Sequence, residues 1–193
     1  MKKIALILAI LMVFSICFTG CKKETTETAA GTYMDAISLL AETYNGSQEA
    51  LAKIAPQEAF VYLKRLDFDY NEFLSNAKQK QIDFLKDLKQ MYGEQAYISI
   101  SVTDVSRYDA ESLKNIGKGL NKTYGIKPAS ITDAYTMTRT IKVIGTEETI
   151  YESGEIVAAK IGEFWYPLYD HSDGEDPIFY FPYLSQKEIN RYS

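Results

Sequence analysis

Hydrophobic residues in the first half of the chain recur every three to four positions, which is the spacing of one face of a helix. Four successive helices are predicted. The second is expected to begin at Ser47, whose hydroxyl can accept backbone N–H bonds, and the third near Pro56. The fourth and longest is expected to run from a capping box at Asp69 and Glu72 to Gly93. Its predicted buried stripe consists of Phe73, Leu74, Ala77, Ile82, Leu85, Leu88, Met91 and Tyr92.

In the second half the pattern changes to alternating apolar and polar residues, which is typical of strands. Strands are expected over 97–105, 131–144, 148–161 and 164–169. One helix is expected from about Ala110 to Tyr124, between the first two strands, with Asp109 as its N-cap and Gly125 at its end. Turns at Gly145 and at 161–163 join the last three strands into an antiparallel meander. N-terminal helices followed by a curved antiparallel sheet predict an α+β domain, with the helices packed on one face of the sheet.

The first twenty residues have a different character. Lys2 and Lys3 precede an apolar run over 4–18, which is shorter than the roughly twenty residues that span a membrane as a helix. A basic head, a short apolar stretch and a small residue at its end are typical of a secretory signal peptide. We therefore expect residues 1–20 to be removed as a signal peptide, and the motif at its end indicates the lipoprotein type.

The segment Phe18-Thr19-Gly20-Cys21 resembles the lipobox of bacterial lipoproteins, with Phe18 in place of the usual Leu. The resemblance implies cleavage between Gly20 and Cys21 and attachment of a diacylglycerol to the Cys21 thiol. The chain would then be held by this lipid on the extracytoplasmic face of the bacterial cell membrane. The alternative is an ordinary secretion signal followed by an incidental cysteine.

Composition indicates one domain behind this leader. Residues 21–31 are mainly Thr, Glu, Lys and Ala and predict a flexible tether, whereas 32–193 contains no second linker and is expected to be a single α+β domain. Cys17 and Cys21 are the only cysteines, so no disulfide is expected in the mature chain. Removing 1–20 takes away two lysines and no acidic residue, which changes the formal charge from -5 to about -7. Nucleic acid is therefore excluded as a partner, because it requires a basic surface.

Two segments resemble a group of surface lipoproteins from Gram-positive bacteria. They are 124–145 and 157–166, and the second combines a basic residue, a glycine turn and an aromatic pair that includes Trp165. Such domains are similar to the nuclear transport factor two superfamily, also called cystatin-like. Over residues 32–169, the resemblance implies a bent sheet wrapped around a long helix, forming a cone with an apolar cavity.

Residue types that carry catalysis or bind metals are sparse. His171 is the only histidine, and the acidic residues around it lack the spacing of a calcium loop. Gly117-Lys118-Gly119 lies within a predicted helix and lacks the Ser or Thr of a phosphate loop. Asp104, Asp133 and Tyr135 are candidates for proton transfer, but surface charge and strand packing explain them equally. We therefore expect no catalytic residue, no cofactor and no metal.

Aromatic side chains are the candidate binding surface. Tyr135, Tyr151, Trp165 and Tyr169 lie on the strands expected to form the cone and are the predicted ligand contacts. The aromatic C-terminal tail at 177–184 either packs over the domain or serves as a lid or partner surface. The predicted function is non-enzymatic binding of a small apolar ligand or a protein partner. The alternatives are a structural or assembly lipoprotein whose cavity is filled by its own side chains, and an enzyme of the isomerase or cyclase kind.

Overall fold

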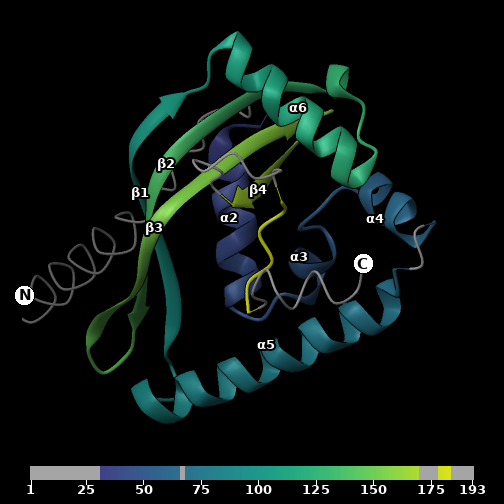
Figure 1. The fold of residues 1–193 in the computed structure, drawn as a ribbon. Coiled ribbons are helices and arrows are strands. Elements are labelled where there is room, and N and C mark those ends of the chain that lie inside the picture. The colour runs from purple at the N-terminus through teal and green to yellow at the C-terminus, as the bar shows by residue number, and fades with distance from the viewer. Residues whose placement is uncertain (1–30, 66–67, 170–177, 184–193) are drawn as a thin grey trace, which may run out of the picture. The chain divides into compact units, whose positions relative to one another are not determined.

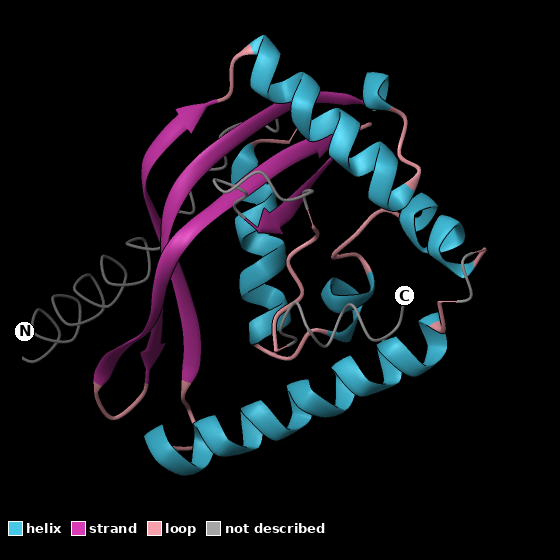
Figure 2. Ribbon diagram, in the orientation of Figure 1, coloured by secondary structure: helices cyan, strands magenta, loops and turns pink. Residues whose placement is uncertain are grey.

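The computed structural model describes residues 31–65, 68–169 and 178–183 (Figures 1 and 2). Gly20, Cys21, most of the predicted tether and the segment around His171 lie outside these residues. By its internal contacts the chain divides into Met1–Ala30 and Gly31–Ser193, and every described residue belongs to the second unit.

Helices come first in this unit and strands follow. In chain order the elements are α2 (Tyr33–Tyr44), α3 (Gln48–Ala52), α4 (Gln57–Lys64), α5 (Tyr70–Tyr92), β1 (Tyr97–Arg107), α6 (Ala110–Tyr124), the 3-10 helix η1 (Pro128–Ser130), β2 (Ile131–Ile144), β3 (Glu148–Ile161) and β4 (Phe164–Tyr169). This order confirms the predicted α+β class. None of the helices described here combines the length and the apolar character that crossing a bilayer requires.

Short-range interactions fix the ends of several helices. The side chains of Ser47, Asp69 and Asp109 each accept a hydrogen bond from the backbone N–H three residues later, at 3.1, 3.0 and 2.7 Å. These bonds satisfy N–H groups that have no partner inside the helix. Helix α6 stops at Gly125, which has a φ of 66° and adopts the left-handed conformation that favours glycine. All four of these helix ends were predicted from the sequence.

Helix α5 buries Phe73, Ala77 and Leu88 of the predicted stripe, but the rest of the buried face differs from the prediction. Gln81 is fully buried, because its amide donates to the Thr43 carbonyl at 2.6 Å and accepts from Gln48. Ile82 and Met91, which were predicted to be buried, are 54% and 67% exposed. Satisfied hydrogen bonds therefore place a polar side chain where the pattern predicted an aliphatic one.

The four strands form one antiparallel sheet in the order β1-β2-β3-β4, which confirms the predicted meander. The sheet is strongly bent, and α2 lies against its concave side while α5 passes one end (Figure 1). The pairing of β2 with β3 shifts register between Ile141 and Lys142, whose partners are Glu152 and Ile150. Tyr151 is thus an extra residue in β3, as in a β-bulge.

Both faces of the sheet are covered at the end where β3 meets β4. Ile156 and Ala158 belong to an apolar cluster with α2, whereas Val157 and Ala159 belong to a second cluster with α4, α6 and the start of α5. Successive strand residues point to opposite faces, so a run of four buried residues requires cover on both sides. The expectation of helices on a single face is therefore wrong at this end.

The aromatic tail packs into the domain over the residues that the structure describes. Phe179, Tyr180 and Phe181 are buried. The Tyr169 N–H donates to the Ile178 carbonyl and the Tyr180 N–H donates to the Pro167 carbonyl, each at 2.9 Å. The tail therefore runs antiparallel along the free edge of β4 and closes it.

Candidate functional site

Of the four predicted ligand contacts, Tyr135 and Trp165 lie together. Their ring centroids are 5.8 Å apart, and the Tyr33 ring also packs on Tyr135, at 4.9 Å. Trp165 is buried, and its indole N–H donates to the carbonyl of Gly31. This pair thus joins the sheet to the beginning of α2, with both rings in contact with protein side chains.

The other two predicted contacts lie elsewhere. The Tyr169 ring packs on the Tyr180 ring of the tail, with centroids 4.4 Å apart. Tyr151 is half exposed and packs edge-on against Phe84 of α5 at 5.6 Å, because the bulge takes it out of the alternation of β3. The four residues therefore do not converge on one site.

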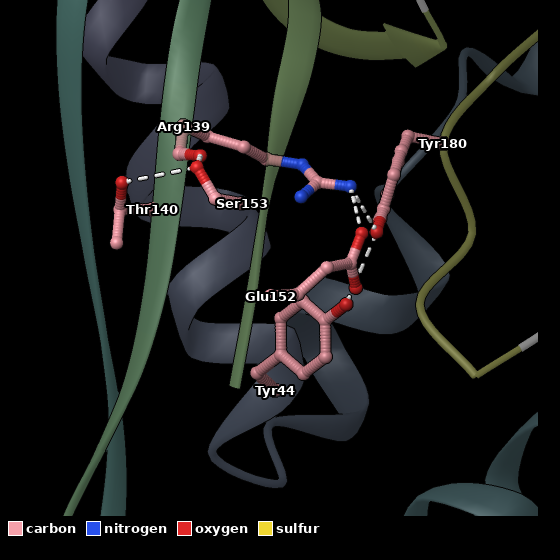
Figure 3. Close-up of polar contacts among 6 residues, drawn as sticks. All are labelled: Tyr44, Arg139, Thr140, Glu152, Ser153 and Tyr180. Atoms are coloured by element: carbon pink, nitrogen blue, oxygen red, sulfur yellow. Dashed lines mark hydrogen bonds and ion pairs between the residues drawn. The ribbon is translucent and has the colours of Figure 1, made fainter. Parts of the chain in front are cut away.

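A buried polar cluster lies at the centre of the concave side, where the resemblance implied an apolar cavity. Arg139 of β2 is 4% exposed. Its Nη2 donates to Glu152 Oε1 at 2.5 Å and to the Tyr180 hydroxyl at 2.9 Å, and its guanidinium carbon lies 4.8 Å from the Tyr180 ring centroid (Figure 3). The Tyr180 hydroxyl is also 3.2 Å from that of Tyr44 in α2. Arg139 thus bonds the sheet to the tail, and the tail in turn to α2.

The positive charge of Arg139 is balanced by the carboxylate of Glu152. Burial opposes ionisation of Arg139, but its interactions with Tyr180 and Glu152 outweigh burial and raise the pKa of the guanidinium overall. The Glu152 side chain is 42% exposed, so the ion pair reaches solvent at one end. Two donors of Arg139, Nε and Nη1, are buried without a hydrogen-bond partner among the described residues.

The alternation of residues in β2 carries a signal for this cluster. Arg139 stands in β2 between Met137 and Ile141, at the positions of the alternation that carry the buried apolar side chains. The neighbouring Thr140 lies on the opposite face, where its hydroxyl is 3.4 Å from that of Ser153 (Figure 3). A cation in phase with the buried residues indicates an internal ion pair.

The tail also raises the pKa of tyrosines around the cluster. Burial is the largest cause for Tyr44, Tyr169, Tyr180 and Tyr183, and it moves each phenol pKa above its ordinary value. The Tyr183 hydroxyl donates to the carbonyl of Thr43 at 3.0 Å. These phenols stay neutral at physiological pH and act as packing and hydrogen-bonding groups.

Two hollows lie next to the turn between β3 and β4. The first, of about 620 Å³, is lined by residues that include Gly31, Asp35, Leu39, Ala52, Lys53 and Trp165. The second, of about 580 Å³, is lined by residues that include Pro56, Glu58, Ile126, Lys127, Ser130 and Ile161. Gln57, Glu163, Phe164 and Tyr166 line both hollows. We call the pair the hairpin groove.

Phe164 is the most exposed large hydrophobic side chain among the residues that line the hairpin groove. Its side chain is 68% exposed, whereas the next residue, Trp165, is buried because successive strand residues face opposite sides. Each hollow has the volume of a site for a drug-sized ligand. Both acidic and basic side chains line the groove, so it has no strong net charge. Of the predicted ligand contacts, Trp165 alone is a lining residue of these two hollows.

The two carboxylates considered for proton transfer interact with neighbouring polar side chains. Asp104 is exposed on β1 and accepts a hydrogen bond from Thr103 at 2.9 Å. The Asp133 carboxylate pairs with the Arg107 guanidinium at 2.8 Å. Neither Asp104 nor Asp133 is buried in an apolar pocket. Within the described ranges, no three His, Cys, Asp or Glu side chains gather as they would around a metal ion.

Comparisons of this chain with protein-family profiles, with characterised proteins and with solved structures found no match.

Proposed function

We propose that this chain is a non-enzymatic binding protein, anchored by lipid at Cys21 on the outer face of a bacterial cell membrane, which takes a small, largely apolar ligand in the hairpin groove. One observation carries the ligand proposal. The groove combines drug-sized hollows with an exposed aromatic side chain, Phe164, whereas the concave side of the sheet is filled by the tail. Aromatic rings offer large contact area at low cost in side-chain entropy.

The proposed fold relationship is with the nuclear transport factor two superfamily. Helices followed by a bent antiparallel sheet, with α2 against the concave side, support it. The proposal differs from the usual use of that fold in one respect. Arg139, Tyr44 and Tyr180 occupy the space where such a domain would hold its ligand, so we place the ligand site in the hairpin groove.

A structural or assembly lipoprotein is the second candidate, and the filled concave side is the observation that favours it. A domain whose interior is closed by its own tail needs no ligand to complete its core. An isomerase or cyclase is the weakest candidate, because the acidic side chains proposed for it, Asp104 and Asp133, lie away from the groove's lining.

Thermal unfolding with a library of apolar and amphiphilic compounds tests the ligand proposal. The protein would start at residue 22, without lipid. A ligand present at 100 times its Kd adds about 2.7 kcal/mol to the free energy of unfolding, which a melting assay detects. Phe164→Ser should remove the stabilisation by that ligand. Ile150→Ser is the matched control, because Ile150 is also exposed (64%) and lies at the other end of β3.

Each result separates the candidates. Stabilisation that Phe164→Ser removes and Ile150→Ser keeps supports binding in the hairpin groove. Stabilisation that persists in the Phe164→Ser variant would show that the ligand binds at another site. Absence of any stabilising compound across a broad library favours the structural candidate.

A further inference from the structure

The hairpin groove lies where the domain is joined to the chain that comes from Cys21. The indole N–H of Trp165 donates to the carbonyl of Gly31, and Gly31 is itself a lining residue of the first hollow. A Cβ on Gly31 would lie 2.1 Å from a carboxylate oxygen of Asp35 and 3.4 Å from the Trp165 ring. The flexible Asp35 carboxylate could move away from such a Cβ, so the hydrogen bond from Trp165 is what holds this junction against β4.

The chain between the junction and the proposed anchor is short. Cys21 precedes Gly31 by ten residues. Even fully extended, these residues span at most about 35 Å, which is comparable to the diameter of a small domain. Lipid at Cys21 would therefore hold the domain within one domain diameter of the bilayer, by a junction on the groove side.

The end of the hairpin has the chemistry of a membrane contact. Phe164 is 68% exposed at the start of β4, directly before the buried Trp165 that binds the junction. Gly162 forms the turn with a φ of 61°. Its N–H donates to the Ser130 carbonyl at 2.8 Å, whereas a Cβ there would meet no atom within 4 Å, so one side of the turn faces open space. Glu163 beside it is exposed and acidic. Attraction to anionic headgroups therefore does not explain a contact, and apolar insertion of the ring does.

We infer that, in the lipid-anchored protein, the β3–β4 hairpin lies on the bilayer with the Phe164 ring inserted among the headgroups, so that the hairpin groove opens at the membrane surface. This inference rests on the proposed anchor at Cys21. It also narrows the ligand class to amphiphilic molecules that partition into the bilayer, because such molecules reach the groove directly from the membrane.

Fluorescence quenching by labelled lipid tests the inference on the lipidated protein. With Cys21 lipidated and Cys17 in the leader, a cysteine introduced by Phe164→Cys is the one free thiol for a bimane label. The protein would be placed in phosphatidylcholine vesicles that contain lipid with a nitroxide at the first carbons of the acyl chain. Ile150→Cys is the control, since it is similarly exposed and precedes the end of β3 by eleven residues, about 36 Å of extended strand.

We expect the nitroxide lipid to reduce the bimane emission at position 164 by about half or more, and to leave position 150 nearly unchanged, since interfacial groups lie about 5–10 Å deep. Vesicle flotation is measured in parallel. If the protein floats and the label at 164 is not quenched, the anchor stands and the membrane contact of the hairpin is overturned. If the protein does not float, the anchor and the inference both fail. A blue shift at 164 that grows with protein density, without quenching, would assign Phe164 to contact between copies of the chain instead.

Discussion

Arg139 points from the middle of β2 into an interior that is otherwise aromatic and aliphatic. One of its three nitrogens has partners among the described residues, and the other two are buried without any. A buried N–H without a partner costs roughly 1–3 kcal/mol. The cluster therefore contributes little to the free energy of unfolding, although it determines where the tail contacts the sheet.

Substitutions in this cluster should have opposite effects. Arg139→Met removes the buried charge and the unpaired donors and keeps most of the volume, so we expect the free energy of unfolding to stay the same or rise by about 1–2 kcal/mol. Glu152→Gln leaves the Arg139 cation buried without a carboxylate and should cost about 2 kcal/mol, reduced by the partial exposure of Glu152. Urea unfolding of both variants measures this. A loss above about 2 kcal/mol for Arg139→Met would show that the ion pair is a net stabiliser.

The buried phenols predict a loss of stability at alkaline pH. Tyr44, Tyr169, Tyr180 and Tyr183 have pKa values raised by burial, whereas an unfolded tyrosine ionises near 10. The folded protein then holds these protons more tightly, so their contribution is complete below pH 10 and falls as pH rises further. Each such tyrosine should lower the free energy of unfolding by about 1.4 kcal/mol per pH unit above its unfolded pKa. Urea unfolding at intervals from about pH 9 to about pH 11 measures the slope, and Tyr44→Phe should make it shallower by one such increment.

Among the elements, β4 separates two adjacent aromatic residues between core and surface. We expect Trp165→Ala to cost about 3–5 kcal/mol, because it removes a buried ring that packs on Tyr135 and bonds to Gly31. Phe164→Ala, one residue away, should change stability by less than about 0.5 kcal/mol because its ring is exposed. Chemical denaturation of residues 22–193 compares them. Equal effects of the two substitutions would contradict the register of β4.

The tail should be required for folding. Phe179, Tyr180 and Phe181 contact both apolar clusters and lie along β4. A chain that ends before Ile178 loses these three buried rings, at about 3–5 kcal/mol for each large aromatic removed, which approaches or exceeds the stability of a typical domain. We expect it to lack a cooperative unfolding transition by circular dichroism. A cooperative transition near that of the full chain would instead identify the tail as a removable cover.

Local signals predicted the elements well, and long-range contacts decided the site. Helix ends at Ser47, Asp69 and Gly125 depend on neighbouring residues, so the sequence was sufficient for them. The burial of Gln81 depends on Thr43, far earlier in the chain, and no pattern within α5 indicates it. The bulge that turns Tyr151 outward depends on the pairing of two strands, which a single sequence leaves open. For the same reason, the filling of the concave side by the tail could not be predicted.

At the scale of the whole molecule, the proposed location depends on the proposed lipid at Cys21. We expect Cys21→Ala to abolish incorporation of a radiolabelled fatty acid and to leave the precursor uncut at Gly20. Cys17→Ala is the control and should be labelled and processed normally, because that residue lies inside the leader. Equal fatty-acid labelling of the Cys21→Ala protein would rule out this anchor.

The contact of the tail with α2 constrains when the protein can fold. The hydroxyl groups of Tyr44 and Tyr180 meet across 136 residues of chain, and Tyr183 bonds to Thr43 across 140. Contacts between such distant segments form late and slow the folding rate, because a long loop must close first. A chain that emerges N-terminus first, from a ribosome or a translocation channel, therefore exposes the apolar face of α2 until residue 180 follows. With the proposed export, a chaperone outside the membrane that shields α2 during this interval would raise the yield of folded protein.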